Sequence, residues 1–288
     1  MERSNLIRVF NYVIRDIENG YYIFDQGGLT EYLEVQFEDI KKLKRGTKMY
    51  DEIGKIENYK IPHYDHTRIY CKNIDSFEKT IEMGEDCAVL NMASARSAGG
   101  GVINGSRAQE EELCRRSNLI YSLYSFTPKG KELFNFDNTA KNQYPIPTFG
   151  GIYSPKVNIY RKPKTYETME SPKLCNVISV SGVIRPRIDE VTGMMANGFP
   201  RMVKRKIRQI FRIAILNHHS KLVLGAFGCG AFKNPPKHVA LLFEEVLNEP
   251  EFKNSFEEIC FAILEDNNSR REHNPEGNLK PFVERFGL

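Results

Sequence analysis

Residues 87–112 read C-A-V-L-N-M-A-S-A-R-S-A-G-G-G-V-I-N-G-S-R-A-Q-E-E-E. The apolar run 87–91 has the length and composition of a buried strand. The three consecutive glycines, residues 99–101, can adopt backbone angles that other residues avoid, and they let a ligand approach the main chain. A glutamine and three glutamates then open an amphipathic segment, 108–124, that is predicted to be one helix. Strand, glycine loop and helix in this order predict an anion site formed by backbone N–H groups near a helix start.

A second junction of the same kind lies near the end of the chain. Residues 222–232 read L-V-L-G-A-F-G-C-G-A-F, an apolar run that enters glycines, and a helix is predicted at 236–247. Further buried strands are predicted at 174–180 and 258–264. Alternating apolar strands and helices indicate a layered α/β core. Because ligands of such sheets lie beyond the carboxyl ends of the strands, we expect both glycine loops to face one cleft.

The remaining elements divide the chain into two parts. Residues 1–67 are predicted to be an accessory segment that starts with a helix and continues irregularly, and residues 68–288 the catalytic domain. Within the second part, residues 125–171 are rich in Pro, Tyr and Lys and predict a long excursion. The other predicted elements are helices at 5–19, 76–83 and 195–217 and strands at 32–35, 68–71, 151–153 and 157–161.

The overall composition is that of an ordinary globular protein. Hydrophobic residues make up 41% of the 288-residue chain and charged residues 27%, with a formal net charge of +4. That charge suits an anionic ligand but does not by itself indicate nucleic acid. The basic run 204–206 lies in a predicted helix, where a solvated helix face is favoured over a nucleic-acid contact.

Cysteine usage and hydropathy point to the inside of a cell. The six cysteines form no C-x-x-C pair and lie mostly in apolar runs, which favours buried free thiols in a reducing compartment. No apolar signal region and no run of membrane-spanning length is present. We therefore expect an intracellular protein, cytoplasmic or nuclear, that does not contact membranes. His63 and His66 have no matching third ligand, so no metal site is predicted.

Neither glycine loop matches a common nucleotide motif. No glycine is followed by Lys-Ser or Lys-Thr at P-loop spacing, and residues 225–230 read G-A-F-G-C-G rather than G-x-G-x-x-G. A G-x-S-x-G elbow is absent as well. Glycines also occur where packing is tight, but two loops that each follow a buried strand favour a binding function.

The glutamates after the first loop admit two interpretations. Acidic residues in a first helical turn complement the helix dipole, which is a structural role. Their closeness to the glycine loop favours acid–base chemistry, because one carboxylate can protonate a leaving oxygen and then activate water. Adjacent helical residues point about 100° apart, so Glu110 and Glu111 are expected to have different roles.

The segment G-G-G, seven residues, then Q-E-E resembles the signature of poly(ADP-ribose) glycohydrolases, in particular the microbial type. Residues 222–232 resemble the second phosphate-binding loop of that family, and the resemblance spans about residues 68–286. It implies a macrodomain-like three-layer α/β/α fold with a mixed central sheet and an N-terminal helical accessory segment. It also implies that ADP-ribose binds at the strand ends and that neither a metal nor another cofactor is needed.

The resemblance also assigns roles to individual residues. Glu111, the second glutamate of Q-E-E, matches the catalytic acid and base, and Glu110 matches a partner that binds ribose hydroxyls. Phe232 matches an aromatic residue that packs on the terminal ribose. The substrate-binding residues that it implies are Gly99, Gly100, Gly101, Gln109, Phe227, Gly228, Cys229, Gly230, Ala231 and Phe232.

Several positions depart from the family pattern. Phe227 stands where Trp is frequent, Ala98 replaces a frequent Pro before the glycines, and Pro235 replaces a frequent Asp. Residues 179–186 differ from the usual Ala-Pro-rich strand end near the adenine. These departures bear on substrate preference and affinity more than on the reaction.

The expected function is hydrolysis of ribose–ribose O-glycosidic bonds in poly(ADP-ribose), mainly at chain ends, with release of ADP-ribose by a monomeric enzyme. An ADP-ribosylated protein is an expected substrate too. One alternative is a macrodomain reader that binds ADP-ribose without hydrolysis, and another is a hydrolase of mono-ADP-ribosyl linkages. The intact Q-E-E favours hydrolysis over the reader, and direct binding of nucleic acid is the least supported interpretation.

Overall fold

The computed structural model describes residues 1–25, 32–38, 40–136, 143–265, 271 and 273–288. Parts of the predicted irregular region (26–31 and 39) and of the predicted excursion (137–142) lie outside the described residues. The main sheet contains β3 (Lys48–Tyr50), β4 (Arg68–Lys72), β5 (Ala88–Met92), β6 (Gly151–Arg161), β7 (Thr168–Val180), β8 (Lys221–Leu224) and β9 (Glu258–Ala262). A separate hairpin contains β1 (Tyr21–Asp25) and β2 (Tyr32–Gln36).

The main sheet is mixed, as predicted. Its strand order is β3-β6-β7-β5-β8-β9-β4. The five strands from β7 to β4 are parallel to their neighbours, whereas β6 runs antiparallel to both β3 and β7. The central strands β5 and β8 are mostly apolar and buried, as expected for strands covered on both faces, whereas the edge strand β4 has exposed Arg68 and Lys72 at its ends.

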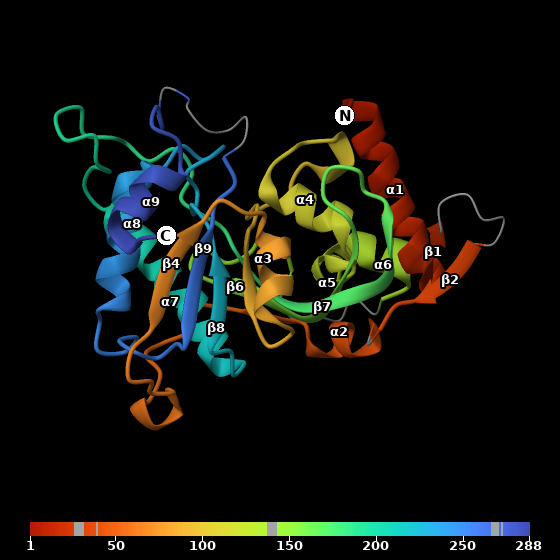
Figure 1. Cartoon of the computed structure of the whole chain (residues 1–288), viewed down its shortest axis with the longest axis horizontal. Helices are drawn as coiled ribbons and strands as arrows, with labels where there is room; N and C mark the ends of the chain where they lie inside the picture. The colour runs from red at the N-terminus through yellow and green to blue at the C-terminus, as the bar shows by residue number, and fades with distance from the viewer. Residues whose placement is uncertain (26–31, 39, 137–142, 266–270, 272) are drawn as a thin grey trace.

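Helices cover both faces of this sheet, which confirms the three-layer architecture (Figure 1). Leu90 and Ile178 point to one face, whereas Val89 and Val177 point to the other. This alternation is the period-two pattern of strands buried on both sides. One layer contains α7 (Phe199–Leu216), α8 (Pro236–Leu247) and α9 (Leu279–Phe286), and the other α1 (Arg3–Asn19), α2 (Ile40–Gly46), α3 (Ser76–Met83), α4 (Gln109–Arg116), α5 (Leu119–Tyr124) and α6 (Pro128–Phe134).

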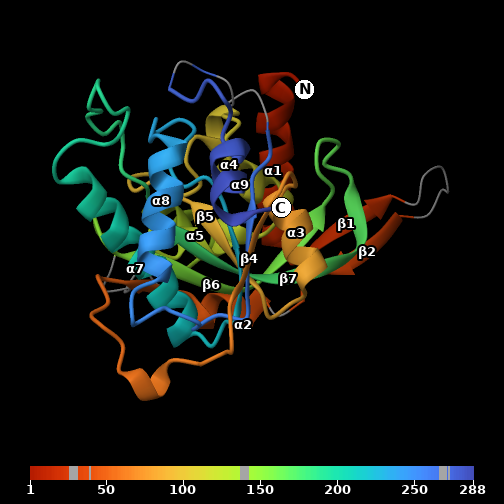
Figure 2. The same cartoon turned by 60° about the vertical axis from the view of Figure 1, so that its left-hand side comes forward.

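The N-terminal region packs on the second layer. The predicted helix 5–19 is confirmed as α1, which ends at Gly20 in the left-handed conformation (φ +80°). The β1–β2 hairpin lies beside β7 in both views (Figure 1 and Figure 2), and Thr168 Oγ1 donates to Ile23 O at 2.8 Å. Strand β3, also from the first 67 residues, pairs with β6 at the edge of the main sheet. The predicted boundary at residue 67 stays a prediction.

The single helix predicted over 108–124 is wrong, because the structure has two helices there. Ser117 between α4 and α5 is extended (φ −148°) and forms an antiparallel bridge with Ile159. Asn118 Oδ1 accepts a hydrogen bond from Asn158 N at 2.9 Å. Pairing with β6 therefore interrupts a pattern that reads as continuous helix, which sequence periodicity alone does not reveal.

Other elements also differ from the prediction. The strands predicted at 151–153 and 157–161 form one strand, β6, with an irregularity where Lys156 has φ +54°. Helix α7 begins at Phe199 instead of 195, because Met195 forms a bridge with Ile188 and donates its N–H to His238 Nδ1 at 2.9 Å. Helix α9 was not predicted.

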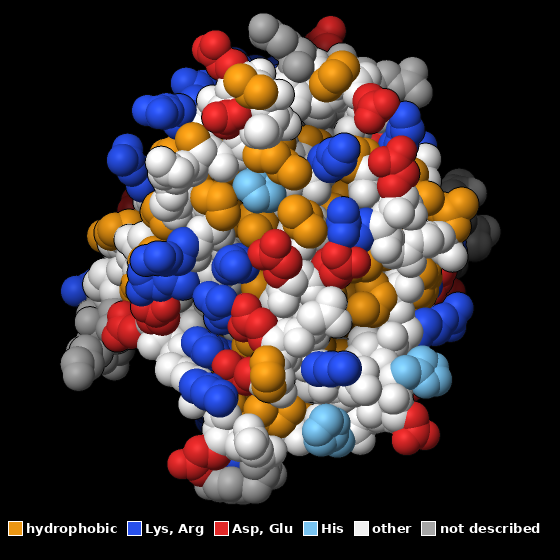
Figure 3. All heavy atoms as spheres, turned by 90° about the vertical axis from the view of Figure 1, so that its left-hand side faces the viewer, with side chains coloured by type: hydrophobic (Ala, Val, Ile, Leu, Met, Phe, Trp, Pro, Cys, Tyr) orange, Lys and Arg blue, Asp and Glu red, His pale blue; other side chains and the backbone are white. Residues whose placement is uncertain are grey.

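The basic run in α7 is not an open cationic surface. Lys204 pairs with Glu245 at 3.2 Å, Arg205 pairs with Glu52, and Lys206 is buried. On the face shown in Figure 3, basic and acidic side chains are interspersed. This arrangement agrees with the solvated-face interpretation for Lys204 and Arg205 but not for Lys206.

The cysteines are free and buried in the described residues, as their apolar surroundings predict. Within the same residues, no helix is both long and apolar enough to cross a bilayer.

Candidate active site

The two glycine loops lie side by side at the carboxyl ends of two central strands of the sheet. Strands β5 and β8 are parallel neighbours, so the loops that follow them emerge together at their carboxyl ends, as predicted. Gly182, just after β7, closes the site from the other side. A methyl group there would lie 3.3 Å from Gly228 Cα and 3.2 Å from the Phe232 ring.

The first loop requires glycine for two separate reasons. Gly99 and Gly100 have positive φ angles of +74° and +59°. A methyl group at Gly100 would lie 2.5 Å from Glu111 Oε1 and 2.9 Å from Glu110 Oε2. The turn and both carboxyl groups are therefore in direct contact, and any side chain at Gly100 would displace the two carboxyl groups.

Glu111 is fixed by two backbone donors. Its Oε1 accepts from Gly101 N at 2.8 Å, and its Oε2 accepts from Ala108 N at 2.9 Å. Because Ala108 has no side-chain oxygen, the second contact also caps the start of α4. The capping and chemical interpretations of this glutamate therefore apply together: the cap holds one oxygen of Glu111 and the glycine turn holds the other.

Glu110 lies in a less polar setting. Its Oε2 accepts from Ser94 N at 2.7 Å, but its Oε1 is buried with no hydrogen-bond partner among the described residues. Burial, followed by the nearby Glu111 charge, raises the pKa of Glu110 to about 8. This carboxyl is therefore mostly neutral at pH 7 and provides a proton inside the site.

Gln109 joins the start of α4 to β5. Its side-chain oxygen accepts from Met92 N at 2.9 Å, and its side-chain nitrogen donates to Leu90 O at 2.7 Å. Both bonds are made to the strand backbone. The side chain thus sets the angle at which α4 leaves the glycine loop.

The second loop is anchored by a residue that sequence reasoning did not single out. Asn234 is buried, and its Nδ2 donates to Val183 O at 2.7 Å and to Gly228 O at 2.9 Å. An asparagine two residues before a helix gave no signal of this cross-link. Gly228 itself has φ +74°.

The side chains in this loop differ in exposure. Phe227 and Cys229 are buried, and burial raises the pKa of the Cys229 thiol. Neither side chain is therefore exposed to a ligand, and Cys229 N donates to Ala226 O at 3.0 Å within the loop. Phe232 is half-buried, Gly230 is partly exposed, and Ala231 is exposed.

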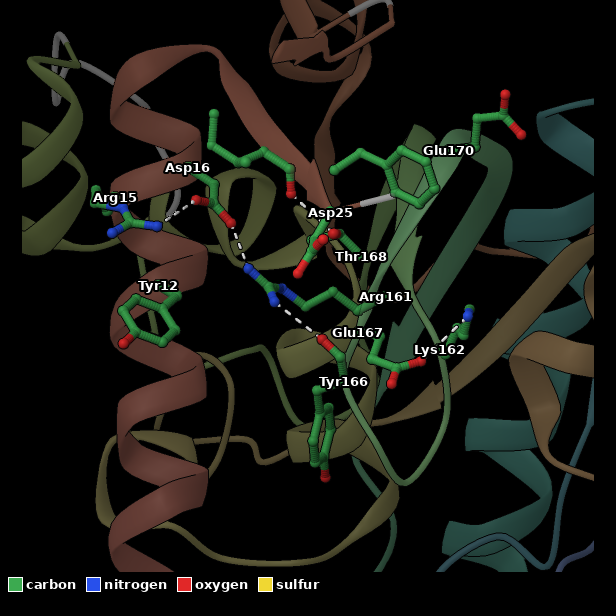
Figure 4. A pocket seen from close by; sticks show the side chains of 12 residues that line it. Tyr12, Arg15, Asp16, Asp25, Arg161, Lys162, Tyr166, Glu167, Thr168 and Glu170 are labelled. Atoms are coloured by element: carbon green, nitrogen blue, oxygen red, sulfur yellow. Dashed lines mark hydrogen bonds and ion pairs between the residues drawn. The ribbon is translucent and has the colours of Figure 1, made fainter. Parts of the chain in front are cut away.

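A cavity of about 770 Å³ lies elsewhere, between α1, β1 and the hairpin that joins β6 to β7 (Figure 4). Asp16 lies at its wall and accepts from Arg161 at 2.5 Å and from Arg15 at 3.4 Å. The described residues that line the cavity include acidic and basic side chains but no glycine, so it differs from the predicted diphosphate site. Among the described residues, no group of three or more His, Cys, Asp or Glu side chains could hold a metal ion.

The arrangement has the elements of acid–base chemistry next to an anion. Two buried carboxyl groups contact a glycine turn that lies close to the start of α4, a position that favours anions. One carboxyl carries a proton at neutral pH, and the other is fixed by two N–H donors. Such a site can give a proton to a leaving oxygen and take one from water.

The chain is similar to a known protein family and to several solved structures. A family model described as microbial-type PARG, catalytic domain, matches residues 12–162, more than half of the chain. The matched part includes the first glycine loop and the Q-E-E glutamates but ends before the second loop. Comparison with curated proteins finds no match.

Solved structures match over nearly the whole chain. Poly(ADP-ribose) glycohydrolase from Thermomonospora curvata is 24% identical, with a TM-score of 0.77 over 98% of this chain and 100% of that one. The same enzyme bound to the inhibitor ADP-HPD gives a TM-score of 0.76 at the same identity and coverage. Poly(ADP-ribose) glycohydrolase from Deinococcus radiodurans in complex with ADP-ribose is 26% identical, with a TM-score of 0.64 over 87% of this chain and 98% of that one.

Proposed function

Because the chain belongs to the microbial-type poly(ADP-ribose) glycohydrolase family, we propose that it hydrolyses the ribose–ribose O-glycosidic bonds of poly(ADP-ribose) and releases ADP-ribose. The contact of 2.8 Å between the Glu111 carboxylate and Gly101 N carries this proposal. It supports an acid–base group held directly against a turn of the kind that accepts phosphate oxygens.

The terminal ADP-ribose unit would bind between the two loops. The glycine turn 99–101 and the N–H groups of Gly228 and Gly230, which have no partner among the described residues, would lie against its diphosphate, and the start of α4 adds a favourable dipole. Phe232, half-buried beside Gly182, offers an aromatic surface to the terminal ribose. Because these contacts use the backbone, substitutions of exposed charged side chains should affect binding little.

Glu111 would act first as an acid and then as a base. As the glycosidic bond breaks, the one proton that the carboxyl pair holds passes through Glu111 to the departing ribose oxygen, and positive charge develops at the anomeric carbon. The diphosphate and the carboxyl pair stabilise that charge. Glu111 then takes a proton from water, whose oxygen bonds to the anomeric carbon and completes ADP-ribose.

Glu110 would bind the ribose hydroxyls. A neutral carboxyl group donates one hydrogen bond as well as accepting others, which suits hydroxyl groups that do both. Its raised pKa also limits the pair to one negative charge at neutral pH, which lowers the repulsion between the carboxyl groups and the incoming diphosphate.

The proposal includes the setting of the reaction. The enzyme would act as a monomer inside the cell, on poly(ADP-ribose) or an ADP-ribosylated protein, without metal, cofactor, membrane or nucleic acid. The pairing of Lys204 and Arg205 with acidic residues supports a reaction that does not involve binding to nucleic acid. Residues 68–288 would form the catalytic domain, and residues 1–67 an accessory segment that packs on it.

The test is a time course of the purified chain with poly(ADP-ribose) and, separately, with a mono-ADP-ribosylated protein, with free ADP-ribose quantified. We expect ADP-ribose from the polymer at a rate far above that from the mono-modified protein. Tight binding of ADP-ribose without release from either substrate would contradict the proposal and favour a reader. Release from the mono-modified protein alone would contradict it in favour of a mono-ADP-ribosyl hydrolase.

A further inference from the structure

The third glutamate of the Q-E-E-E run, Glu112, contacts a segment distant in sequence. Both of its carboxylate oxygens accept from the Tyr166 hydroxyl, at 2.8 and 2.6 Å. Tyr166 is buried, with 6% of its surface exposed, in the hairpin between β6 and β7. It therefore ties the first turn of the catalytic helix to that hairpin.

The hairpin is itself held at a defined position. Tyr166 has φ +59°, and its carbonyl accepts from Arg161 Nη1 at 3.0 Å. The same guanidinium donates to Asp16 of α1 at 2.5 Å (Figure 4). Hydrogen bonds to a charged donor are stronger than neutral ones, so the Tyr166 side chain starts from a fixed backbone.

From Glu112 the contacts continue towards the active site. Arg115, one turn further along α4 and fully buried, donates to Glu112 Oε1 at 2.8 Å and to Ser106 O at 2.6 Å. Ser106 N in turn donates to Gly101 O at 3.2 Å. Since Gly101 N donates to Glu111 Oε1 at 2.8 Å, an unbroken series of hydrogen bonds joins Tyr166 to Glu111.

The segment that this series crosses is also held by the N-terminal helix: Arg3 Nε donates to Asn104 O at 2.5 Å, and Arg107 donates to Met1 O. Between the glycines and α4, Ile103 is 45% exposed, and Asn104, Ser106 and Arg107 are exposed as well. Val102 is buried and fixes one end of the segment. The Arg115 contact with Ser106 O fixes the other end, next to the backbone donors of Glu111.

We propose that Tyr166, Glu112 and Arg115 are positioning residues that hold residues 101–108 so that Glu111 stays against the glycine turn. This inference rests on the proposed function. The three side chains touch neither the predicted diphosphate site nor the carboxyl pair, so they act on the reaction through Glu111. A displacement of about 1 Å in a catalytic group can cost about 10²-fold in rate, so a partial loosening should be measurable.

The test uses Tyr166→Phe, which removes only the hydroxyl. Its matched control is Tyr153→Phe, because Tyr153 is as buried (7% exposed) and its hydroxyl bonds to His219 Nε2 at 2.8 Å. That hydroxyl lies at the amino-terminal ends of the central strands, away from the glycine loops. Its partner His219 precedes β8 and bonds to the backbone of Asp86, which precedes β5. Thermal unfolding of both variants shows how much each hydroxyl stabilises the fold.

We expect Tyr166→Phe to lower kcat on poly(ADP-ribose) by about tenfold, with KM and ADP-ribose affinity within about twofold of wild type. Tyr153→Phe should keep the wild-type kcat below its unfolding temperature. If the role of Tyr166 were structural alone, both variants would lower the unfolding temperature and neither would change kcat.

Glu112→Gln, alone and combined with Tyr166→Phe, gives a second test. Residues of one network should not act independently, so the double variant should lose clearly less activity than the product of the two single losses. Independent losses, or an unchanged kcat in Tyr166→Phe, would overturn the inference. A wild type that releases no ADP-ribose would instead overturn the proposed function, so the two failures are distinguishable.

Discussion

Replacement of Glu110 by Gln should stabilise the protein most at alkaline pH. Glu110 is 4% exposed, and one of its oxygens has no hydrogen-bond partner in the described part of the chain. Burial, with a smaller contribution from Glu111, raises its pKa from 4.5 to about 8. The folded protein therefore keeps a proton that the unfolded chain releases between these two pH values.

The sign and size of the effect follow from linkage. Where the folded state binds more protons than the unfolded state, the free energy of unfolding falls as pH rises. The fall is about 1.4 kcal/mol for each pH unit, so the window from 4.5 to about 8 corresponds to up to about 5 kcal/mol. Glutamine has a similar shape and does not titrate, so Glu110→Gln should lack this fall.

The assay is urea unfolding of wild type and Glu110→Gln at pH values from 5 to 8.5. We expect the stability of the variant relative to wild type to increase steadily across this range and to level off above pH 8. Glu170→Gln, at an exposed position in β7, is the control that should follow wild type at every pH. Parallel pH dependence of wild type and Glu110→Gln would show that Glu110 ionises normally and would refute the reasoning.

Two further substitutions test the loops. Gly100→Ala places a methyl group 2.5 Å from Glu111 Oε1, at a position whose φ is positive. We expect turnover to fall by at least about 10²-fold, measured by kinetics, and the free energy of unfolding to fall by about 1–2 kcal/mol, measured by urea unfolding. Asn234→Ala removes the donor to Val183 O and Gly228 O. At about 1 kcal/mol for each hydrogen bond the loss is about 2 kcal/mol, so we expect ADP-ribose affinity to fall by up to about 30-fold, measured by calorimetry. Unchanged turnover in the first variant, or unchanged affinity in the second, would contradict the geometry of the corresponding loop.

Sequence reasoning predicted the parts of the fold that depend on local pattern. Helices α1 and α8 have clear periodicity and clear ends, and the parallel strands are short apolar runs. The break between α4 and α5 could not be predicted in this way, because it depends on the pairing of Ser117 with Ile159. These two residues are 42 positions apart in the sequence. Non-local pairing overrides local propensity at that point.

The site was predicted to a similar degree. The two glycine loops and the Q-E-E glutamates are contiguous motifs, so spacing and family resemblance were enough to bring them together. Asn234 and Tyr166 were missed because their partners lie on other elements: the backbone of two loops in one case, and Glu112 in the other. The proton on Glu110 was also missed, since burial is a property of the folded chain.

The central claim is that Glu111 carries the proton for bond cleavage while the loops bind ADP-ribose without it. The most direct measurement compares wild type and Glu111→Gln for release of ADP-ribose from poly(ADP-ribose), with the ADP-ribose affinity of both measured by calorimetry. The account predicts a rate loss of about 10²–10⁴-fold with affinity nearly unchanged. Equal rates for the two proteins would contradict it.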